Sequence, residues 1–298
     1  MRVFLSVARS ESLTGAARRL ALDPATVGRR IARLEAAMDA ALFAKSPRGY
    51  VLTERGERLR DRVAEAEAAL RLGAEEGAGD EGLTGQVRIG APDGCANFVL
   101  PQVCTAMQAA NPGLEIQILA LPRVVNLSKR EADLAITVSP PDAGRLIVRK
   151  IADYRLHLAA RRDLGIRGRA DLRAHRIVGY IPDTIFDAAL DYLGEVGADG
   201  VQTASNSVAV QLQLLRHGGV GVVHDFALPF APELVRVLVN EVSLNRAFYL
   251  VRHDADRRSA RMGRIADALA SGVAVEIARL ERAAELTAGG RTVEPDHG

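Results

Sequence analysis

The feature that most constrains the fold is an alternation of short apolar runs with helical patterns from Gln86 onward. The first series contains VRIGA, FVLPQVCTAMQAANP, LEIQILAL, VVNLSKREA and DLAITVS. Apolar runs of strand length that alternate with helical segments predict a parallel sheet covered by helices. A second series, with HRIVGYI, FDAALDYLGEVG, VQTASN, VAVQLQLLRHG and VGVVHDF, returns through RAFYLVRH to a helix near Ser259–Ala274. The sequence therefore predicts two similar α/β halves, joined by crossing strands, that enclose a cleft.

Composition is that of an ordinary globular protein of about two domains. The chain has 298 residues, of which 48% are hydrophobic and 26% are charged. No run approaches the ~18 apolar residues of a membrane span, and the N-terminus MRVFLSVARSES lacks the features of a secretory signal. Cys95 and Cys104 are the only cysteines, and the six histidines are scattered, so neither a disulfide framework nor a zinc-ligand set is indicated. We expect a cytoplasmic protein without a metal, another cofactor or a membrane partner.

Charge is distributed unevenly along the chain. The net charge is only +2, but residues 1–60 contain twelve basic and six acidic side chains, which gives this end +6 and leaves the remainder at about −4. A basic end on a nearly neutral chain indicates a polyanionic partner for that end.

A helix that begins at Asp23 carries the most concentrated basic cluster. Asp23 can accept hydrogen bonds from the N–H groups of a helix start, and Pro24 suits the first helical position. One face, within about 40° at about 100° per residue, is apolar and holds Val27, Ile31, Leu34 and Met38. Another arc of about 100° holds Thr26, Arg29, Arg30 and Arg33. Each arginine alone would fit a solvated face, but such a face interleaves both signs, and Glu35 lies outside this arc.

The surrounding residues complete a helix-turn-helix pattern. Ser12 can cap a helix over Leu13–Leu20, and a break at Ala21–Leu22 leads to the helix that begins at Asp23. Two short helices, the second with exposed arginines, are typical of a motif whose second helix enters the major groove of DNA. Downstream, LFAKSPRGYVLTERG predicts a small hairpin, or wing, with Lys45 and Arg48 at its tip.

The wing is followed by a predicted linker helix. Thr53 can cap a helix that extends to about Leu72. An a/d seam, with spacings of four, three and four, is formed by Leu59, Val63, Ala66 and Leu70. The seam spans only two heptads, so the helix either pairs with a second copy or packs on its own domain. The following GAEEGAGDEGLTG is rich in Gly and acidic residues and predicts a hinge.

Taken together, these motifs resemble the LysR-type transcriptional regulators. The resemblance rests on FLSVARSESLTGAARRL, VGRRIARLE, ALFAKSPRGYVLTERGERL and the later QVRIGAP. It is strongest over residues 2–60 and continues to about residue 275. Two departures are present: the chain begins almost directly on the first helix, and Gly28 stands where many members have Ser. Glycine within a helix costs about 1 kcal/mol relative to Ala, and it removes a hydroxyl that could contact phosphate.

The resemblance implies an α/β protein with three parts. Residues 1–53 would form a winged helix-turn-helix domain, and residues 54–85 a linker, or dimerisation, helix with a hinge. Residues 86–298 would form a periplasmic-binding-protein-like effector domain. Its expected parts are subdomain I (about 86–160 and 253–275), subdomain II (about 161–252) and a tail (276–298).

The resemblance also implies roles for individual residues. The major groove of double-stranded DNA would be contacted by Thr26, Arg29, Arg30 and Arg33. Lys45 and Arg48 would contact phosphates or the adjacent minor groove. Pairing of the linker helix would give a homodimer or homotetramer, and RNA polymerase is an expected partner.

Ligands of open α/β sheets bind at the carboxyl ends of strands, where helix N-termini offer N–H groups to anions. By resemblance, four loops at such ends line the effector cleft and contribute Pro92, Asp93, Gly94, Cys95, Ser139, Ser205, Asn206 and His224. Family members often use Thr or Ser in the first loop to hold a carboxylate, whereas this chain has Asp93, which argues against a simple anionic effector. Taken singly, these positions also fit structural roles: a helix cap for Ser205 or Ser207, a turn for Asp93, and core packing for Cys95.

Three alternatives to an effector-controlled regulator can be weighed from the residues. An enzyme is disfavoured because no Gly-x-Ser-x-Gly elbow is present, GGVGVV lacks dinucleotide-binding spacing, and the adjacent His224 and Asp225 would point to opposite faces of a strand. No catalytic residue is therefore proposed. A solute-binding protein would leave residues 1–60 unexplained. A regulator that acts through DNA and partner contacts alone, without a ligand, remains open.

Overall fold

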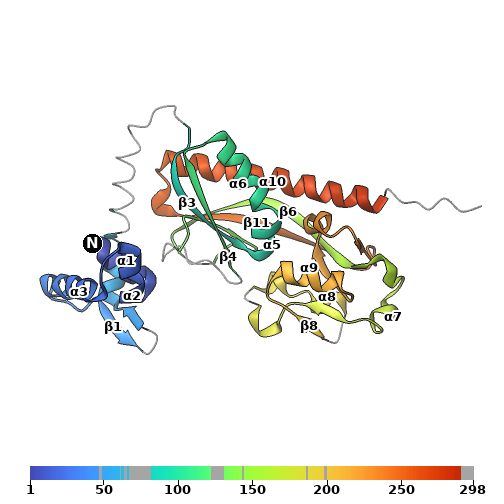
Figure 1. The fold of residues 1–298 in the computed structure, drawn as a ribbon, viewed down its shortest axis with the longest axis horizontal. Coiled ribbons are helices and arrows are strands. Elements are labelled where there is room, and N and C mark those ends of the chain that lie inside the picture. The colour runs from blue at the N-terminus through green and yellow to red at the C-terminus, as the bar shows by residue number, and fades with distance from the viewer. Residues whose placement is uncertain are drawn as a thin grey trace, which may run out of the picture. The chain divides into compact units, whose positions relative to one another are not determined.

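The structure, a computed structural model, describes residues 1–46, 49–60, 62–63, 66, 82–121, 131–142, 144–185, 187–197 and 200–289 (Figure 1). The chain divides into two compact units, of which one includes residues 1–81 and the other begins at Gly82. No helix of the described residues has both the length and the apolar composition that crossing a membrane requires.

The N-terminal domain contains three helices and a two-stranded hairpin. The helices are α1 (Arg2–Ser10), α2 (Leu13–Leu20) and α3 (Pro24–Met38), and the strands are β1 (Phe43–Ser46) and β2 (Gly49–Leu52). Its core contains Phe4, Val7, Ala16, Ala17, Val27, Ile31 and Leu42. The small side chains of Ala16 and Ala17 are fully buried, so α2 can lie close to its neighbours. The predicted helix-turn-helix and wing are confirmed.

Local sequence explains where these helices begin and end. The Ser12 side chain accepts a hydrogen bond from the backbone N–H of Gly15, and Asp23 accepts one from that of Thr26. Both are N-cap bonds, which satisfy donors that a helix start leaves open. Helix α2 ends at Leu20, and its C-cap Ala21 adopts a left-handed conformation with φ of 53°, which begins the short turn to α3.

In the second unit, nine strands of the described residues form one sheet. The strands are β3 (Gly85–Pro92), β4 (Leu114–Leu121), β5 (Leu134–Thr137), β6 (Leu146–Arg161), β7 (Ile177–Gly179), β8 (Thr203–Ala204), β9 (Val220–His224), β10 (Leu234–Arg236) and β11 (Ser243–His253). Their order is β4-β3-β5-β11-β6-β9-β7-β8, with β10 paired to β6. The helices are α5 (Asp93–Phe98), α6 (Leu100–Ala110), α7 (Arg169–Leu172), α8 (Leu193–Val196), α9 (Val208–Arg216) and α10 (Ala260–Gly289).

The sheet consists of two parallel groups joined by long antiparallel strands. β3 pairs in parallel with β4 and β5, and β7 pairs in parallel with β8 and β9. Between these groups, β11 pairs antiparallel with β5, and β6 pairs antiparallel with β9. The predicted α/β architecture with two halves and crossing strands is confirmed. The residue limits of the two subdomains stay a prediction.

Helix α10 corrects one expectation. A helix was expected to end near Ala274 and a tail to follow from residue 276, but α10 continues to Gly289. The reason is packing: Ile277, Leu280 and Ala284, spaced three and four apart, are buried. Glu281 also accepts hydrogen bonds from the backbone N–H and the Nε of Arg155 on β6, at 2.8 Å and 3.0 Å. Figure 1 shows this long helix running past α6.

Candidate nucleic-acid interface and effector cleft

Helix α3 presents its basic arc to solvent. Arg29, Arg30 and Arg33 are exposed, while Val27 and Ile31 on the opposite face are buried. The Nη2 of Arg29 donates a hydrogen bond to the hydroxyl of Thr26 at 2.9 Å, and that hydroxyl donates to Asp23. The first turn therefore orients Thr26 and Arg29 together, and the side chains of Arg30 and Arg33 are exposed.

The cap of α3 is a stable anion. Hydrogen bonds from the side chain and the backbone of Thr26 hold the pKa of the Asp23 carboxyl below its usual value. The ionised carboxylate suits the positive end of the helix dipole. Asp23 thus fixes the start of α3 without forming part of the basic arc.

Glu35, the acidic residue outside the arc, has a structural role. Its Oε1 accepts hydrogen bonds from the backbone N–H groups of Leu42 and Phe43, at 2.7 Å and 3.1 Å. A charged acceptor of this kind makes stronger bonds than a neutral one. Glu35 therefore ties the last turns of α3 to the start of the wing, and its charge is turned away from the arginines.

The wing docks onto the turn between α1 and α2. The backbone N–H of Tyr50 donates to the carbonyl of Glu11 at 2.8 Å. Gly49 has φ of +119°, and a Cβ there would lie 2.4 Å from the same carbonyl oxygen, so this approach requires glycine. Lys45 lies in β1 opposite Tyr50, one pair before the turn. Arg48 lies outside the described residues.

The predicted dimerisation seam is only partly described. Thr53 caps the following helix, because its hydroxyl accepts a bond from the Gly56 N–H at 3.0 Å. Leu59 and Val63 are partly buried and pack against the N-terminal core, Ala66 is exposed, and Leu70 lies outside the described residues, as does most of the predicted hinge. The two packed side chains favour the alternative in which the helix belongs at least partly to its own domain.

In the second unit, two of the predicted cleft loops make hydrogen bonds to the opposite half of the sheet. Asp93 follows β3, and its Oδ2 accepts hydrogen bonds from the hydroxyl of Ser207 (3.0 Å) and the backbone N–H of Ala209 (3.3 Å) at the start of α9. Ser139 follows β5 and donates its hydroxyl proton to Asp187 Oδ1 at 3.0 Å. Two of the expected loops therefore contact each other, that of Asp93 and that before α9, whereas the loop of Ser139 contacts a segment that was not predicted.

The other predicted cleft residues serve more local roles. Pro92 precedes α5, and Cys95 within that helix is fully buried. The hydroxyl of Ser205 accepts the Ser207 N–H at 3.1 Å, and Asn206 is exposed. Of the two residues weighed as a helix cap, Ser207 is the N-cap of α9 and accepts the Val210 N–H, whereas the Ser205 hydroxyl bonds the backbone two residues on.

His224 lies inside an aromatic cluster. A Cβ on Gly94 would lie 3.5 Å from the His224 ring, which stacks on Tyr154 with ring centroids 5.5 Å apart, and Tyr154 stacks on Phe248 at 4.2 Å. Burial lowers the pKa of His224 to about 3, so its imidazole is neutral at physiological pH. His224 Nδ1 and the Tyr154 hydroxyl are both buried and have no hydrogen-bond partner among the described residues.

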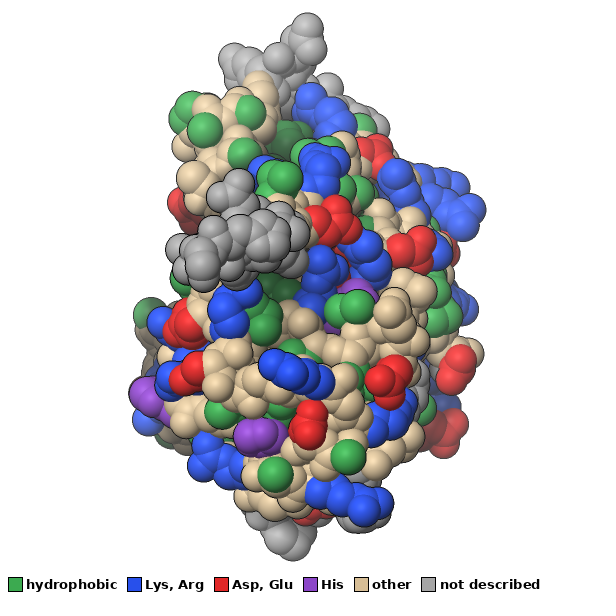
Figure 2. Space-filling view, turned by 90° about the vertical axis from the view of Figure 1, so that its right-hand side faces the viewer, with side chains coloured by type: hydrophobic (Ala, Val, Ile, Leu, Met, Phe, Trp, Pro, Cys, Tyr) green, Lys and Arg blue, Asp and Glu red, His purple; other side chains and the backbone are tan. Residues whose placement is uncertain are grey.

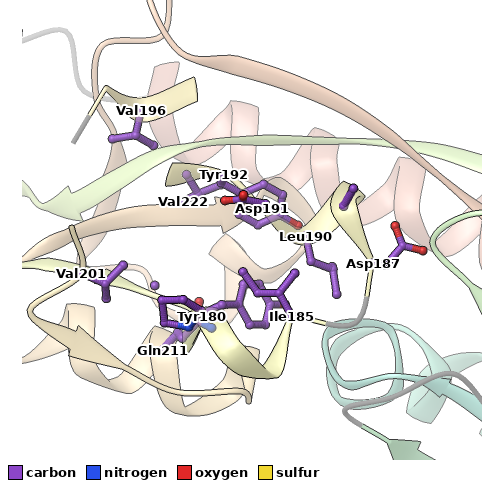
Figure 3. A pocket seen from close by; sticks show the side chains of 13 residues that line it. Tyr180, Ile185, Asp187, Leu190, Asp191, Tyr192, Val196, Val201, Gln211 and Val222 are labelled. Carbon is purple, nitrogen blue, oxygen red and sulfur yellow. The ribbon is translucent and has the colours of Figure 1, made fainter. Parts of the chain in front are cut away.

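One cavity of the described residues lies to one side of these loops. It has a volume of about 480 Å³, within the range typical of small-molecule sites, and lies in the half of the sheet that contains β7, β8 and β9. It is lined by Gly179, Tyr180, Pro182, Ile185, Asp187, Ala188, Leu190, Asp191, Tyr192, Val196, Val201, Gln211 and Val222. In Figure 3, Ile185 and Asp187 lie toward one end of this cavity and Val196 and Val201 toward the other.

None of the predicted effector residues lines this cavity. Ser139 and Asp93 nevertheless adjoin it: Ser139 bonds Asp187, and the charge of Asp93, after burial itself, contributes to raising the pKa of Tyr180. The missed segment 180–192 follows β7, so the strand-end rule applied to IVGY would have found Tyr180. Asp187 and Asp191 lie further along this segment, away from the end of a strand. The strand-end rule therefore does not predict that they line the cavity.

The two thiols are unsuited to reactive chemistry. Burial raises the pKa of Cys104 to about 11, and that of Cys95, which is buried nearby, also lies well above the usual value. Reactive cysteines need a lowered pKa and access to solvent. Within the described part of the chain, no group of three or more His, Cys, Asp or Glu side chains could hold a metal ion.

Comparison with known proteins supplies the family. Residues 1–57 match the model of the bacterial regulatory helix-turn-helix protein, lysR family, and residues 80–274 match that of the LysR substrate binding domain. The regulator DgdR of Burkholderia cepacia is 35% identical over 149 residues, which are 48% of this chain and 49% of that protein. The glycine cleavage system transcriptional activator of Escherichia coli K12 is 26% identical over 286 residues, 89% of each chain.

The chain spans about half the length of the first curated relatives it matches. Solved structures cover nearly all of it. A full-length OxyR variant from Pseudomonas aeruginosa has a TM-score of 0.69 at 16% identity and covers 91% of this chain and 92% of its own. Full-length LysG of Corynebacterium glutamicum with the bound effector Arg has a TM-score of 0.60 at 19% identity and covers 91% and 95%. These likenesses show the shared fold, and the two family models together match most of the sequence: the chain belongs to the LysR family of bacterial helix-turn-helix regulators.

Proposed function

We propose that the protein is a sequence-specific DNA-binding transcriptional regulator of the LysR type, located in the cytoplasm and controlled by a small molecule. The observation that carries the proposal is the basic arc of α3. Three exposed arginines stand beside the capped first turn of a helix whose opposite face is buried in the domain core. This is the arrangement by which a recognition helix reads the major groove.

Base and phosphate contacts would be divided between α3 and the wing. Arg29, which is held by Thr26, and Arg33, one turn later, are the candidates for base edges, because arginine can bind guanine through two hydrogen bonds. Lys45 and Arg48 on the wing would contact phosphates or the adjacent minor groove. Such contacts release counterions, so affinity should fall steeply with salt.

The effector would bind in the unit that begins at Gly82. The cavity of about 480 Å³ supports this proposal, as does the hydrogen bond of the predicted residue Ser139 to Asp187, which lines it. A ligand that favours one arrangement of the two halves would shift the population of states with different affinities for DNA. Among similar proteins, LysG is solved with bound Arg, which shows that a regulator of this fold can bind an amino acid.

Oligomerisation and polymerase contact complete the proposal. A homodimer or homotetramer would present several copies of α3 to successive major grooves, and Ala66 and Leu70 remain the candidates for pairing of the linker helix. Contact with RNA polymerase is proposed as the step that changes transcription. A peroxide sensor that uses thiols is not proposed, because both cysteines are buried.

A gel shift on the DNA upstream of the gene for this protein, with excess nonspecific competitor, tests the function. We expect a specific complex that Arg29→Ala and Arg33→Ala each weaken at least about tenfold, since a good bidentate base contact is worth about 1–3 kcal/mol. Arg149→Ala is the matched control and should bind DNA normally. It removes an exposed arginine that pairs with Asp267, both in the unit that begins at Gly82. Unchanged specific binding by both α3 variants would refute the assignment of the recognition helix.

A further inference from the structure

The carboxylate of Asp93 occupies the N-terminus of α9. Helix α9 has nine residues, and Ser207 is its N-cap. Asp93 Oδ2 accepts the hydroxyl proton of Ser207 at 3.0 Å and the backbone N–H of Ala209, in the first turn, at 3.3 Å. Donors of this kind are where an anionic ligand would otherwise bind. In this protein, the chain itself supplies the anion.

A second anion at this position would be repelled. Two like unit charges about 4 Å apart repel each other strongly at the effective dielectric typical near a protein surface. An effector carboxylate would also find its donors already engaged. Asp93 therefore excludes carboxylate ligands from the start of α9.

The charged side chains that line the adjoining cavity are acidic. Asp187 and Asp191 line it, and no Lys, Arg or His is among its described lining residues. Arg246 is close by: its Nε donates to the carbonyl of Ala189 at 3.2 Å, and its guanidinium lies 5.9 Å from the ring centroid of Tyr192. Asp93 acts on Tyr180, so the three carboxylates named here outnumber the one guanidinium named, and burial keeps the neighbouring His224 neutral.

The remaining walls of the cavity are apolar or aromatic. Ile185, Leu190, Val196, Val201 and Val222 supply aliphatic surface. Tyr180 and Tyr192 supply rings with a negative face, which attract organic cations. On the outer face drawn in Figure 2, by contrast, basic and acidic side chains are interspersed, so the selection of charge would come from the cavity.

We infer that the ligand of this cavity is an organic cation, an amine or guanidine on an apolar body, and that Asp93 takes the place that an effector carboxylate would occupy. The inference rests on the proposed function, because it assigns a chemical class to the effector. The ammonium or guanidinium group would lie near Asp187 and Asp191, and the body against the aliphatic walls. Asp93 is then a specificity-determining residue that acts by exclusion.

Isothermal titration calorimetry of the full-length protein tests the charge class with matched probes. 2-Phenylethylamine and 3-phenylpropionate have similar bodies and opposite charges; tyramine and agmatine extend the cationic series. We expect at least one of the three amines to bind and the carboxylate not to bind. Asp187→Asn keeps an acceptor for Ser139 and removes the charge, so with Asp191→Asn it should weaken amine binding about tenfold or more. Asp153→Asn, at an exposed pair with Lys150, should leave amine binding unchanged.

The Asp93→Asn variant tests the exclusion directly. It should admit 3-phenylpropionate, because the start of α9 loses its internal charge. Binding of 3-phenylpropionate but not of the amines to the wild-type protein would overturn the inference, as would failure of all three amines to bind at millimolar concentration. The same preparation is also tested for a specific gel shift with the upstream DNA. A shift without amine binding would overturn only the ligand class, whereas the absence of a specific shift would contradict the proposed function.

Discussion

Two glycines in helices of the N-terminal domain should respond in opposite directions to alanine. A Cβ on Gly28, in α3, would have one neighbour within 4 Å, Leu13 Cδ1 at 3.7 Å, which is ordinary van der Waals contact. A Cβ on Gly56 would lie 2.1 Å from the carbonyl oxygen of Leu42 and 2.9 Å from Leu52 Cδ2. That carbonyl accepts the Thr53 N–H at 3.0 Å, so it cannot move without loss of a hydrogen bond.

The magnitudes follow from these distances. Gly28→Ala should stabilise the domain by about 0.5–1 kcal/mol, because alanine reduces the backbone entropy lost on folding and meets no steric obstacle. Gly56→Ala gains the same helix preference but must displace the Leu42 carbonyl, and overpacking of this kind costs about 1–3 kcal/mol. We expect a net destabilisation of about 1–2 kcal/mol.

Hydrogen–deuterium exchange of the full-length protein is the suitable assay, because it reports the opening of one domain in a chain whose global melting temperature mixes several. Peptides from α3 should exchange up to about fivefold more slowly in Gly28→Ala and about tenfold faster in Gly56→Ala. If both variants changed the exchange rate of these peptides in the same direction, the packing described here around one of the two glycines would be contradicted.

Two further predictions concern the second unit. The pKa of His224 is about 3 in the folded protein, against an ordinary value of 6.5. Below pH 6.5 the unfolded chain therefore binds more protons than the folded one, and the free energy of unfolding in urea should fall by about 2 kcal/mol between pH 7 and pH 5. His224→Phe should remove this loss, and His217→Gln, at an exposed site, should preserve it. Glu281→Ala should lower the free energy of unfolding in urea by about 1–3 kcal/mol, because it leaves a half-buried Arg155 N–H without its acceptor. Glu285→Ala, which removes a surface ion pair with the same arginine, should lower it by less than about 1 kcal/mol. Equal effects of the two variants would contradict the difference in burial between the two glutamates.

The helices and strands that position α3 were predictable because their signals are local. Ser12 and Asp23 cap the helices they were expected to cap, and the apolar face with Val27 and Ile31 is buried as its 3.6-residue period indicates. The alternation of strands and helices likewise required no knowledge of distant contacts. Helix α10 was predicted too short, since its last turns are held by the bond of Glu281 to Arg155, which joins residues 126 positions apart.

The cleft was harder to predict for the same reason. The strand-end rule identified Asp93, Ser139 and His224, but it could not show that Asp93 would bind the start of α9 or that Ser139 would bind Asp187. Those bonds link loops that are far apart in the sequence. The cavity of about 480 Å³ therefore lies next to the predicted residues and is not lined by them. The role of Glu35 was missed as well, because its acceptance of two wing N–H groups depends on where the wing docks.

The most direct test of the central claim is the ratio of affinities for the upstream DNA of this gene and for an unrelated fragment of equal length. We would measure it by fluorescence anisotropy at several salt concentrations for the wild type, Arg29→Ala and Arg149→Ala. The wild type and Arg149→Ala should prefer the upstream fragment by about a thousandfold or more, and Arg29→Ala should lose at least about tenfold of that preference. Equal affinities of the wild type for both fragments, or an unchanged preference in Arg29→Ala, would contradict the claim that α3 reads the DNA sequence.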